Sequence, residues 1–272
     1  MFSLGSSVWF NQHFTLTIPI AFAASKGFDI IGPQTTAGFA CLKSQNYTYS
    51  IVRADSNTNG VIDPNAIATL QNAKAAGLST SIYLFLCPGA PLTQVSTVIS
   101  GINKSLYNIV WLKIATSSTT QCNWSNYSKA KNCQFLTSIL QGTNSSGIKA
   151  GIFTIKTIWT ANCGTTCSFG QLGYVSLWYA DYLVSGKVES TQSFADFTAF
   201  GGFGGWTQPD LKMIVGNSTV TLCNNPKWTT FINLNWHSWS AYLIIPLIHF
   251  ILFDYIDTCS LSCWWGCIRE HW

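Results

Sequence analysis

The stretch Pro64–Leu86, PNAIATLQNAKAAGLSTSIYLFL, contains the pattern that decides the fold of this chain. Pro64 opens a run with apolar residues at helical spacing, and the run ends at Gly77. Proline in the first turn and glycine just past the last turn are typical boundaries of a helix. The following segment, 79–86, is apolar almost throughout, as is typical of a strand buried on both faces. The stretch therefore predicts a helix followed by a strand of a parallel sheet.

The alternation of strand and helix continues in both directions from this stretch. Apolar segments rich in β-branched residues predict further strands, and helical spacing predicts helices between them. The expected strands lie at 27–31, 49–54, 79–86, 108–114, 148–155, 174–180 and 211–216, and the expected helices at 36–45, 64–77, 92–103 and 130–142. Such β/α units predict an α/β fold and fit a β/α barrel better than an open sheet.

The composition indicates a protein with a large core and a neutral polar surface. Hydrophobic residues make up 47% of the 272 residues and charged residues 9%, with a net charge of +4. The basic residues form no cluster, which argues against nucleic acid as a partner. The 10 cysteines favour an oxidising compartment, so we expect a secreted, extracellular or lysosomal protein. N-glycosylation sequons agree with this location: Asn46, Asn103, Asn123, Asn126, Asn144 and Asn217.

The N-terminal segment resembles a secretion signal. An apolar run, Phe14–Ser25, contains the sequence Ala21-Phe22-Ala23, which is similar to a signal-peptidase site, although no basic residue precedes the run. We therefore expect residues 1–24 to be a signal peptide. The alternative is an ordinary buried N-terminal segment.

The C-terminal segment departs from the barrel pattern. We expect residues 25–237 to form the barrel domain and residues 238–272 to be an irregular hydrophobic and Cys-rich tail. The apolar run 241–253 is shorter than the roughly 20 residues of a membrane span. Membrane association is expected only if this run inserts.

Several stretches, in the right order, resemble family 25 glycoside hydrolases, the lysozyme family, in its cysteine-containing invertebrate branch. They are KGFDIIGPQTTAGFACLKSQNYTYSIVRA (26–54), VIDPNAIATLQNAKAAGLSTSIYLFLCPG (61–89), GIFTIKTIW (151–159), LWYADY (177–182) and FGGWTQPDLK (203–212). The resemblance covers about residues 26–236. It implies a flattened, TIM-like β/α barrel that cleaves the β-1,4 link of peptidoglycan with carboxylates at the strand C-termini. The family also implies a disulfide between Cys41 and Cys223.

The acids that the resemblance implies are largely replaced. The family carries W-L-D-I-E where this chain has Trp111-Leu112-Lys113-Ile114-Ala115, so Lys113 replaces an Asp and Ala115 replaces the Glu that protonates the leaving group. In INLNW (232–236), Asn233 stands where an active-site Asp is expected. Of the family's site acids only Asp29 remains, and the glutamates, Glu189 and Glu270, do not follow predicted barrel strands. Glycoside hydrolysis needs a proton donor and a second carboxylate, so we expect impaired catalysis.

The remaining acid has a predicted partner. Lys113 and Ala115 lie two residues apart on a strand and therefore face the same side. We expect Lys113 to point into the former active-site cleft and to contact Asp29. Asp29 either binds sugar or caps a loop, and a lysine beside it would favour the ionised carboxylate. A relocated acid, Asp55 or Asp181, is the alternative source of a proton.

Further candidate residues come from the strands and from the cysteines. Aromatic side chains on or after strands either stack on sugar rings or pack in the core: Tyr83, Trp111, Phe153, Trp178 and Tyr179, with Asp181 on the rim. Cys122 and Cys133 flank a short loop and are expected to pair, whereas Cys163 and Cys167 pair with each other or with Cys87. Residues 55–66 partly match a calcium loop, but Ala66 replaces its last ligand. We therefore prefer a polar turn and expect no metal or cofactor.

The sequence therefore predicts a secreted, catalytically impaired lysozyme-like protein. Its expected partners are peptidoglycan or other N-acetylhexosamine glycans, in innate defence or digestion. The alternatives are an active lysozyme with a relocated acid and a membrane-tethered glycan-binding module.

Overall fold

A computed structural model describes residues 19–21, 25–56, 60–90, 92–115, 120–180, 194–199, 201–218, 223, 232–237 and 240–242. The chain divides into two compact units. The larger unit, Phe22–Trp239, contains the barrel. The other unit combines Met1–Ala21 with Ser240–Trp272, and its described part is β1 (Pro19–Ala21) paired antiparallel with β10 (Ser240–Tyr242).

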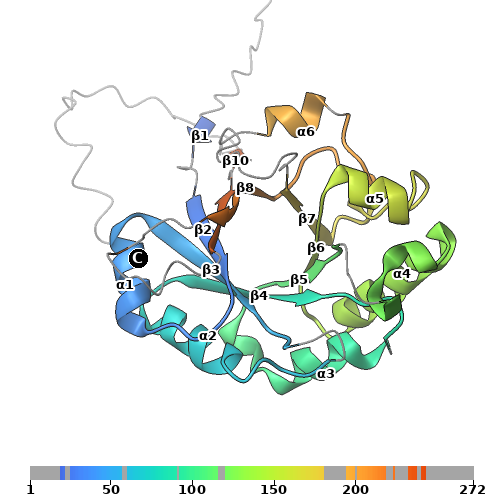
Figure 1. Cartoon of the computed structure of the whole chain (residues 1–272). Helices are drawn as coiled ribbons and strands as arrows, with labels where there is room; N and C mark the ends of the chain where they lie inside the picture. The colour runs from blue at the N-terminus through green and yellow to red at the C-terminus, as the bar shows by residue number, and fades with distance from the viewer. Residues whose placement is uncertain are drawn as a thin grey trace, which may run out of the picture. The chain divides into compact units, whose positions relative to one another are not determined.

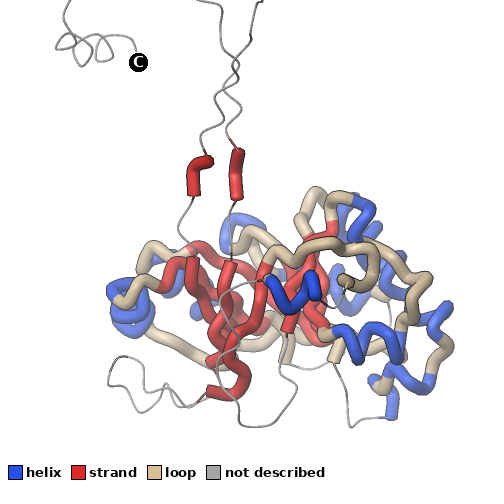
Figure 2. Tube along the Cα trace, turned by 90° about the horizontal axis from the view of Figure 1, so that it is seen from above, coloured by secondary structure: helices blue, strands red, loops and turns tan. Residues whose placement is uncertain are grey.

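The larger unit is a β/α barrel. Its parallel strands are β2 (Ser25–Ile30), β3 (Tyr47–Arg53), β4 (Ser79–Phe85), β5 (Val110–Lys113), β6 (Ala150–Thr154), β7 (Val175–Ala180) and β8 (Leu211–Ser218). Strand β9 (Ile232–His237) pairs antiparallel with both β8 and β2 and so closes the barrel. The strands lie side by side within a surrounding layer of helices (Figure 1; Figure 2).

Helices connect the strands on the outside of the barrel. They are α1 (Thr36–Ser44), α2 (Ala66–Ala75), α3 (Thr93–Gly101), α4 (Lys129–Ser145), α5 (Lys156–Asn162) and α6 (Ala195–Ala199). Short 3₁₀ turns lie at η1 (Lys104–Leu106), η2 (Thr120–Cys122), η3 (Trp124–Asn126) and η4 (Gly170–Leu172). Thr35 caps α1 by accepting a hydrogen bond from the Gly38 N–H, and Gly77 follows α2 with a positive φ of 77°.

The alternation of side chains along each strand divides the core into two layers. On β5, Trp111 lies in the interior cluster, whereas Leu112 lies in the cluster beneath the helices. The interior cluster comprises Ile51, Tyr83, Trp111, Phe153, Trp178, Ala180, Leu211 and Met213. Because the strands are buried on both faces, they are apolar nearly throughout.

The α/β barrel prediction is confirmed, with strand and helix ends that differ slightly from those expected. Several elements were missed, among them strand β9 and helix α5 in the barrel. Strand β9 is short and contains Asn233 and Asn235, so no apolar run marks it. Helix α5 begins directly after β6, and Ile155 at its N-cap position makes no side-chain capping bond, so the start signal is absent.

The predictions for the two ends of the chain, the signal peptide and the C-terminal tail, remain predictions. Of residues 1–24, the structure describes only 19–21, and the segment after Tyr242 lies outside the described residues. Within the described part, no helix is long and apolar enough to cross a membrane.

Candidate functional site

Lys113 and Asp29 form a buried ion pair inside the barrel. The Nζ atom of Lys113 on β5 lies 3.0 Å from Oδ2 of Asp29 on β2. The two side chains are only 5% and 2% exposed. The predicted contact is therefore confirmed, and Asp29 is engaged by a lysine rather than exposed to a ligand.

Aromatic rings surround the Lys113 ammonium. Its Nζ atom lies 4.0 Å from the centroid of Tyr83, 4.6 Å from that of Phe153 and 4.7 Å from that of Trp178. A cation over such rings is attracted by their negative faces, more strongly when water is excluded. The rings and the carboxylate together replace the hydration that this buried ammonium has lost.

Two tyrosines adjoin the same carboxylate. Burial, and then the charge of Asp29, raise the pKa of Tyr83 and that of Tyr49 well above the ordinary value. The ring of Tyr49 lies over Gly27, where an added Cβ would come within 2.1 Å of the ring. Both phenols therefore stay protonated at neutral pH, and the space above Gly27 is filled by protein.

Most of the predicted sugar-stacking aromatics are core residues. Trp178 packs edge to face against Trp111, Phe153 and Tyr83, with ring centroids 5.6, 4.6 and 6.4 Å away. Tyr83, Trp111 and Trp178 are buried, and Trp111 also fills the space above Gly151. The prediction that these rings bind substrate is not supported by this geometry, because no ring face is open to a sugar.

Tyr179 lies on the opposite side of its strand. It packs against Phe197 of α6 at 5.1 Å, within the layer beneath the helices. Its neighbour on β8, Lys212, is fully buried and pairs with Asp196 of α6 at 2.8 Å. Tyr179 was predicted to bind substrate, but here it is buried beneath the helices. Adjacent strand residues face opposite sides, so Trp178 and Tyr179 could not both face the interior.

The other expected acid positions lie near the same end of the barrel. Asn233 on β9 lies opposite Asp29 on β2 in the antiparallel strand pairing. It is therefore the cross-strand neighbour of the ion-paired Asp29. Ala115 follows β5 and is half-buried, with only a methyl group where the family resemblance implies a proton donor. Asp181 lies outside the described residues, so its role on the rim stays a prediction.

Asp55 is a buried carboxyl whose acidity is altered by its surroundings. Its Oδ2 accepts a hydrogen bond from the Phe85 N–H at 3.1 Å, and its Oδ1 is buried without a hydrogen-bond partner among the described residues. Burial raises the pKa of Asp55 from its ordinary 3.8 to about 7, although the Phe85 N–H and Arg53 act in the opposite direction. In the same turn, Asp63 binds Arg53. Asn57, in the stretch 55–66 that partly matches a calcium loop, lies outside the described residues.

A pocket that the sequence did not predict opens beside Ala115. It has a volume of about 340 Å³ and lies between the 3₁₀ turn η3 and helix α5. Its apolar lining comes from Ala115, Trp124, Ile158 and Ala161. Loops at the C-terminal ends of barrel strands are where such folds bind ligands. The pocket could not be predicted from the sequence, because helix α5, which forms one of its walls, was not predicted.

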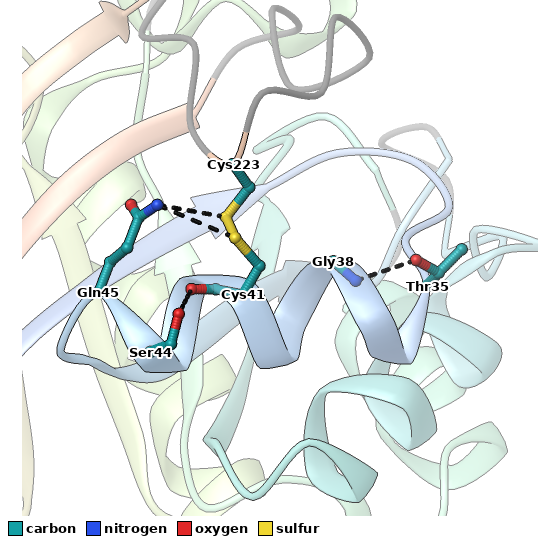
Figure 3. The surroundings of a disulfide bond; sticks show 6 residues. All are labelled: Thr35, Gly38, Cys41, Ser44, Gln45 and Cys223. Carbon is teal, nitrogen blue, oxygen red and sulfur yellow. Dashed lines mark hydrogen bonds between the residues drawn. A yellow bond between two sulfur atoms is a disulfide. The ribbon is translucent and has the colours of Figure 1, made fainter.

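Three disulfides fix the loops of the described chain. The predicted bond between Cys41 and Cys223 is confirmed, with Cα atoms 6.0 Å apart (Figure 3). The bond ties α1 to the segment between β8 and β9, and the side-chain amide of Gln45 lies beside it (Figure 3).

The predicted pairing of Cys122 with Cys133 was wrong. Cys122 is bonded to Cys87, and Cys133 is bonded to Cys167. Cys163 is a free, buried cysteine, and burial raises the pKa of its thiol to about 12. Loops of neighbouring parallel strands meet at one end of the barrel, so residues distant in sequence become partners.

The arrangement lacks the chemistry of a glycosidase at the expected positions. Lys113 occupies the interior where a carboxylate is expected, and Ala115 has no proton to donate. Among the described residues, no group of three or more His, Cys, Asp or Glu side chains could hold a metal ion. The described geometry offers a buried ion pair in the barrel interior and a neutral pocket between η3 and α5.

Comparison with known sequences identifies the relatives of this chain. Residues 21–213 match a family model described as lysozyme-like protein 1. A Dictyostelium discoideum protein named "Probable GH family 25 lysozyme 5" is 32% identical over 75% of this chain and 89% of its own length. "Lysozyme-like protein 7" of Caenorhabditis elegans is 29% identical over 71% of this chain and 67% of its own length.

Solved structures share the fold. A family GH25 lysozyme from Aspergillus fumigatus has a TM-score of 0.59 at 16% identity, over 79% of this chain and 94% of its own. A muramidase from Acremonium alcalophilum has a TM-score of 0.59 at 17% identity, over 80% of this chain and 95% of its own.

Proposed function

This chain belongs to the lysozyme-like family of glycoside hydrolase family 25, and from that premise we propose that it is a secreted protein that binds peptidoglycan or a related N-acetylhexosamine glycan without hydrolysing it efficiently. Membership in the family supports a function directed at peptidoglycan-related glycans. The proposal of lost hydrolysis depends on the residues of this chain.

One observation carries the proposal: the Lys113 ammonium is bound to the Asp29 carboxylate, at 3.0 Å, in the barrel interior. Efficient glycoside hydrolysis requires one carboxyl group to protonate the leaving oxygen and a second carboxylate on the other face of the sugar ring. Here Asp29 is paired and buried, and Ala115 is aliphatic. Neither residue can donate a proton to a glycosidic oxygen.

Glycan binding and glycan turnover can be measured separately. Sedimentation with insoluble peptidoglycan and with chitin tests binding, because bound protein leaves the supernatant. Release of reducing ends from the same polymers tests turnover. We expect depletion from the supernatant without release above that of a heat-inactivated sample. Failure to sediment with either polymer would refute the proposed binding function.

Secretion is supported by the disulfides, since such bonds persist in oxidising compartments. The segment ending at Ala23 is the proposed signal peptide. N-terminal sequencing of protein secreted by eukaryotic cells should begin close to Ser25. Mature protein that retains Met1 would contradict this part of the proposal.

Asp55 supports a second candidate function, an active lysozyme with a relocated acid. Its pKa of about 7 is that of a group able to hold and release a proton near neutral pH. However, its carboxyl is 3% exposed and bonded to the Phe85 N–H, so a glycosidic oxygen cannot reach it without a rearrangement. If the protein does hydrolyse cell walls and Asp55→Asn abolishes that activity, this candidate replaces the first.

A further inference from the structure

Exposed lysines gather at one end of the barrel. They are Lys26 near the start of β2, Lys43 and Lys74 in the last turns of α1 and α2, Lys104 in η1, and Lys149 directly before β6, and together they are called the lysine row. Each lies where the chain enters a barrel strand. The lysine row therefore lies at the N-terminal end of the strands, opposite to the end that usually binds the substrate of such barrels.

Contacts between neighbouring connections show that the lysines follow one another around the barrel. The Nζ atom of Lys43 lies against the turn after α2, which is the connection that contains Lys74. Lys74 in turn donates to the Ser105 carbonyl in η1. Lys104, also in η1, donates to the Ser146 carbonyl at 2.8 Å, in the connection to β6. The lysine row thus forms an arc that follows the order of the strands from β2 to β6.

Helix capping explains only part of this arrangement. A cation in the last turn of a helix offsets the helix dipole, which accounts for Lys43 and Lys74. Lys26 and Lys149 lie outside the helices, so the same reason does not apply to them. An ammonium group has three N–H donors, and a bond to one carbonyl leaves donors that can meet a ligand.

The charge along the lysine row has a single sign. The stretches 43–50, 74–80, 102–110 and 144–150, which contain four of its lysines, include no Asp or Glu. Among the described residues, the acid at this end of the barrel is Asp210, which precedes β8 outside the arc and accepts the Leu177 N–H at 2.8 Å. A surface of one sign attracts ligands of the opposite charge. The lysines are distant in sequence, so no basic cluster was visible in the chain itself.

Neutral polar groups lie between the lysines. Exposed residues of the same connections include Ser44, Ser79, Ser105, Asn108 and Ser146. Their hydroxyl and amide groups can form hydrogen bonds with the hydroxyl groups of a polyol. An arc of separate cations with hydroxyl groups between them suits a linear polymer in which phosphates alternate with polyol units.

We propose that the lysine row binds a linear alditol-phosphate polymer, the kind of polyanion that accompanies peptidoglycan in some cell walls. The inference goes beyond the proposed glycan-binding function, because it assigns a second ligand to the other end of the barrel. The phosphodiester groups pair with the ammonium groups, and the alditol hydroxyls meet the serine hydroxyls. Because these ion pairs are exposed, added salt weakens the binding.

Three sequons lie in the same connections, at Asn46, Asn103 and Asn144. N-linked sugar at these positions would stand beside the lysine row. The test therefore uses full-length protein secreted by eukaryotic cells, with whatever N-linked sugar it carries. Protein treated with a glycosidase that removes this sugar is measured beside it.

Sedimentation compares two preparations of Gram-positive cell walls that carry an alditol-phosphate polymer. One is untreated, and the other is extracted with hydrofluoric acid, which cleaves phosphodiester bonds and leaves the peptidoglycan. Isothermal titration with soluble poly(glycerol phosphate) measures the affinity directly. The Lys43→Gln, Lys149→Gln variant removes two charges from the lysine row. Its matched control is Lys129→Gln, Lys131→Gln, which removes two exposed lysines from the first turn of α4, at the other end of the barrel.

We expect the secreted protein to bind untreated walls at least about tenfold more tightly than extracted walls. The variant of the lysine row should bind poly(glycerol phosphate) several-fold to about tenfold more weakly, and the control should bind as wild type does. Equal binding of the two wall preparations by the secreted protein would overturn the proposal, even if the protein without sugar distinguishes them. Equal losses in the two variants would also overturn it, because net charge alone would then explain the binding.

Other polyanions provide a further control. Tighter binding of a single-stranded oligonucleotide or of anionic lipid vesicles than of poly(glycerol phosphate) would assign the lysine row to another class of partner and overturn the proposal. The wall preparations also separate this inference from the proposed function. Equal binding of untreated and extracted walls would leave glycan binding standing and reject the lysine row. Binding of untreated walls alone, without binding of extracted walls or chitin, would support the lysine row and reject glycan binding.

Discussion

Lys113 and Asp29 lie 3.0 Å apart as a buried ion pair in the interior of the barrel. A charge in such a position is tolerated only when a partner compensates it. The carboxylate and the rings of Tyr83, Phe153 and Trp178 provide that compensation. A position where the family resemblance implies an acid thus holds a cation, and this cation is bound to Asp29.

The ion pair should show strong coupling in a double-mutant cycle. Lys113→Met removes the ammonium from the buried Asp29 carboxylate, and Asp29→Asn removes the negative charge from beside the buried ammonium. Each single change should lower the free energy of unfolding by about 3–5 kcal/mol, whereas the double variant should lose far less. Urea unfolding followed by circular dichroism measures these values.

A matched control for this cycle is Lys149→Met, because Lys149 is an exposed lysine next to β6. It should change the free energy of unfolding by no more than about 0.5 kcal/mol. Additive effects of the Lys113 and Asp29 changes would show that the two side chains do not interact as described.

Asp55 should make the protein more stable in acid than at alkaline pH. Its folded-state pKa of about 7 lies above the ordinary 3.8, so the folded state binds the proton more tightly. The resulting stabilisation is fully present below pH 3.8, decreases as the pH rises, and is lost above about pH 7. Its size is of the order of 4 kcal/mol.

Urea unfolding between pH 4 and pH 8 compares wild type with Asp55→Asn, which keeps the side-chain shape without the titrating group. We expect the variant to show a much flatter dependence on pH across the interval from 3.8 to about 7. A wild-type protein that gains stability through this interval, with no change in Asp55→Asn, would contradict the assignment.

The Cys41–Cys223 bond should be the most stabilising of the three described disulfides, because it joins residues 182 positions apart. Constraint of the unfolded chain increases with loop length, so Cys41→Ser with Cys223→Ser should cost about 2–5 kcal/mol. The corresponding Cys133→Ser, Cys167→Ser variant is the comparison, with a separation of 34. Thermal unfolding measures both, and a larger loss in the second variant would refute this ranking.

Peptide mapping under non-reducing conditions should recover the three disulfide pairs of the described chain. The expected pairs are Cys41–Cys223, Cys87–Cys122 and Cys133–Cys167, and Cys163 should be alkylated only after denaturation because it is buried. A peptide that links Cys122 to Cys133 would restore the pairing expected from sequence and contradict the structure.

The sequence predicted the barrel because its parallel strands must be buried on both faces, and this requirement leaves apolar runs such as 79–86. It also predicted the contact of Lys113 with Asp29, since a two-residue alternation and the family's site geometry place both side chains inside. Strand β9 and helix α5 escaped prediction because no local sequence pattern marks them. Their positions are determined by contacts within the closed barrel.

The pocket and two of the three described disulfides escaped prediction for a related reason. Cys87 and Cys122 follow neighbouring strands, β4 and β5, and meet only when those strands are parallel and adjacent. The aromatic residues of the strands have two possible roles, in the core or at a sugar, and their residue types alone do not distinguish these roles. Only the observed burial assigns Tyr83, Trp111 and Trp178 to the core.

The central claim is our proposal that this barrel does not hydrolyse peptidoglycan efficiently. The most direct measurement is the clearing of a bacterial cell-wall suspension by purified wild-type protein. It is followed beside the Lys113→Asp, Ala115→Glu double variant and the Aspergillus fumigatus lysozyme as the active control. We predict no clearing by wild type and a measurable gain in the double variant, which regains a proton donor and a second carboxylate. Clearing by wild type at a rate near that of the active control would contradict the claim.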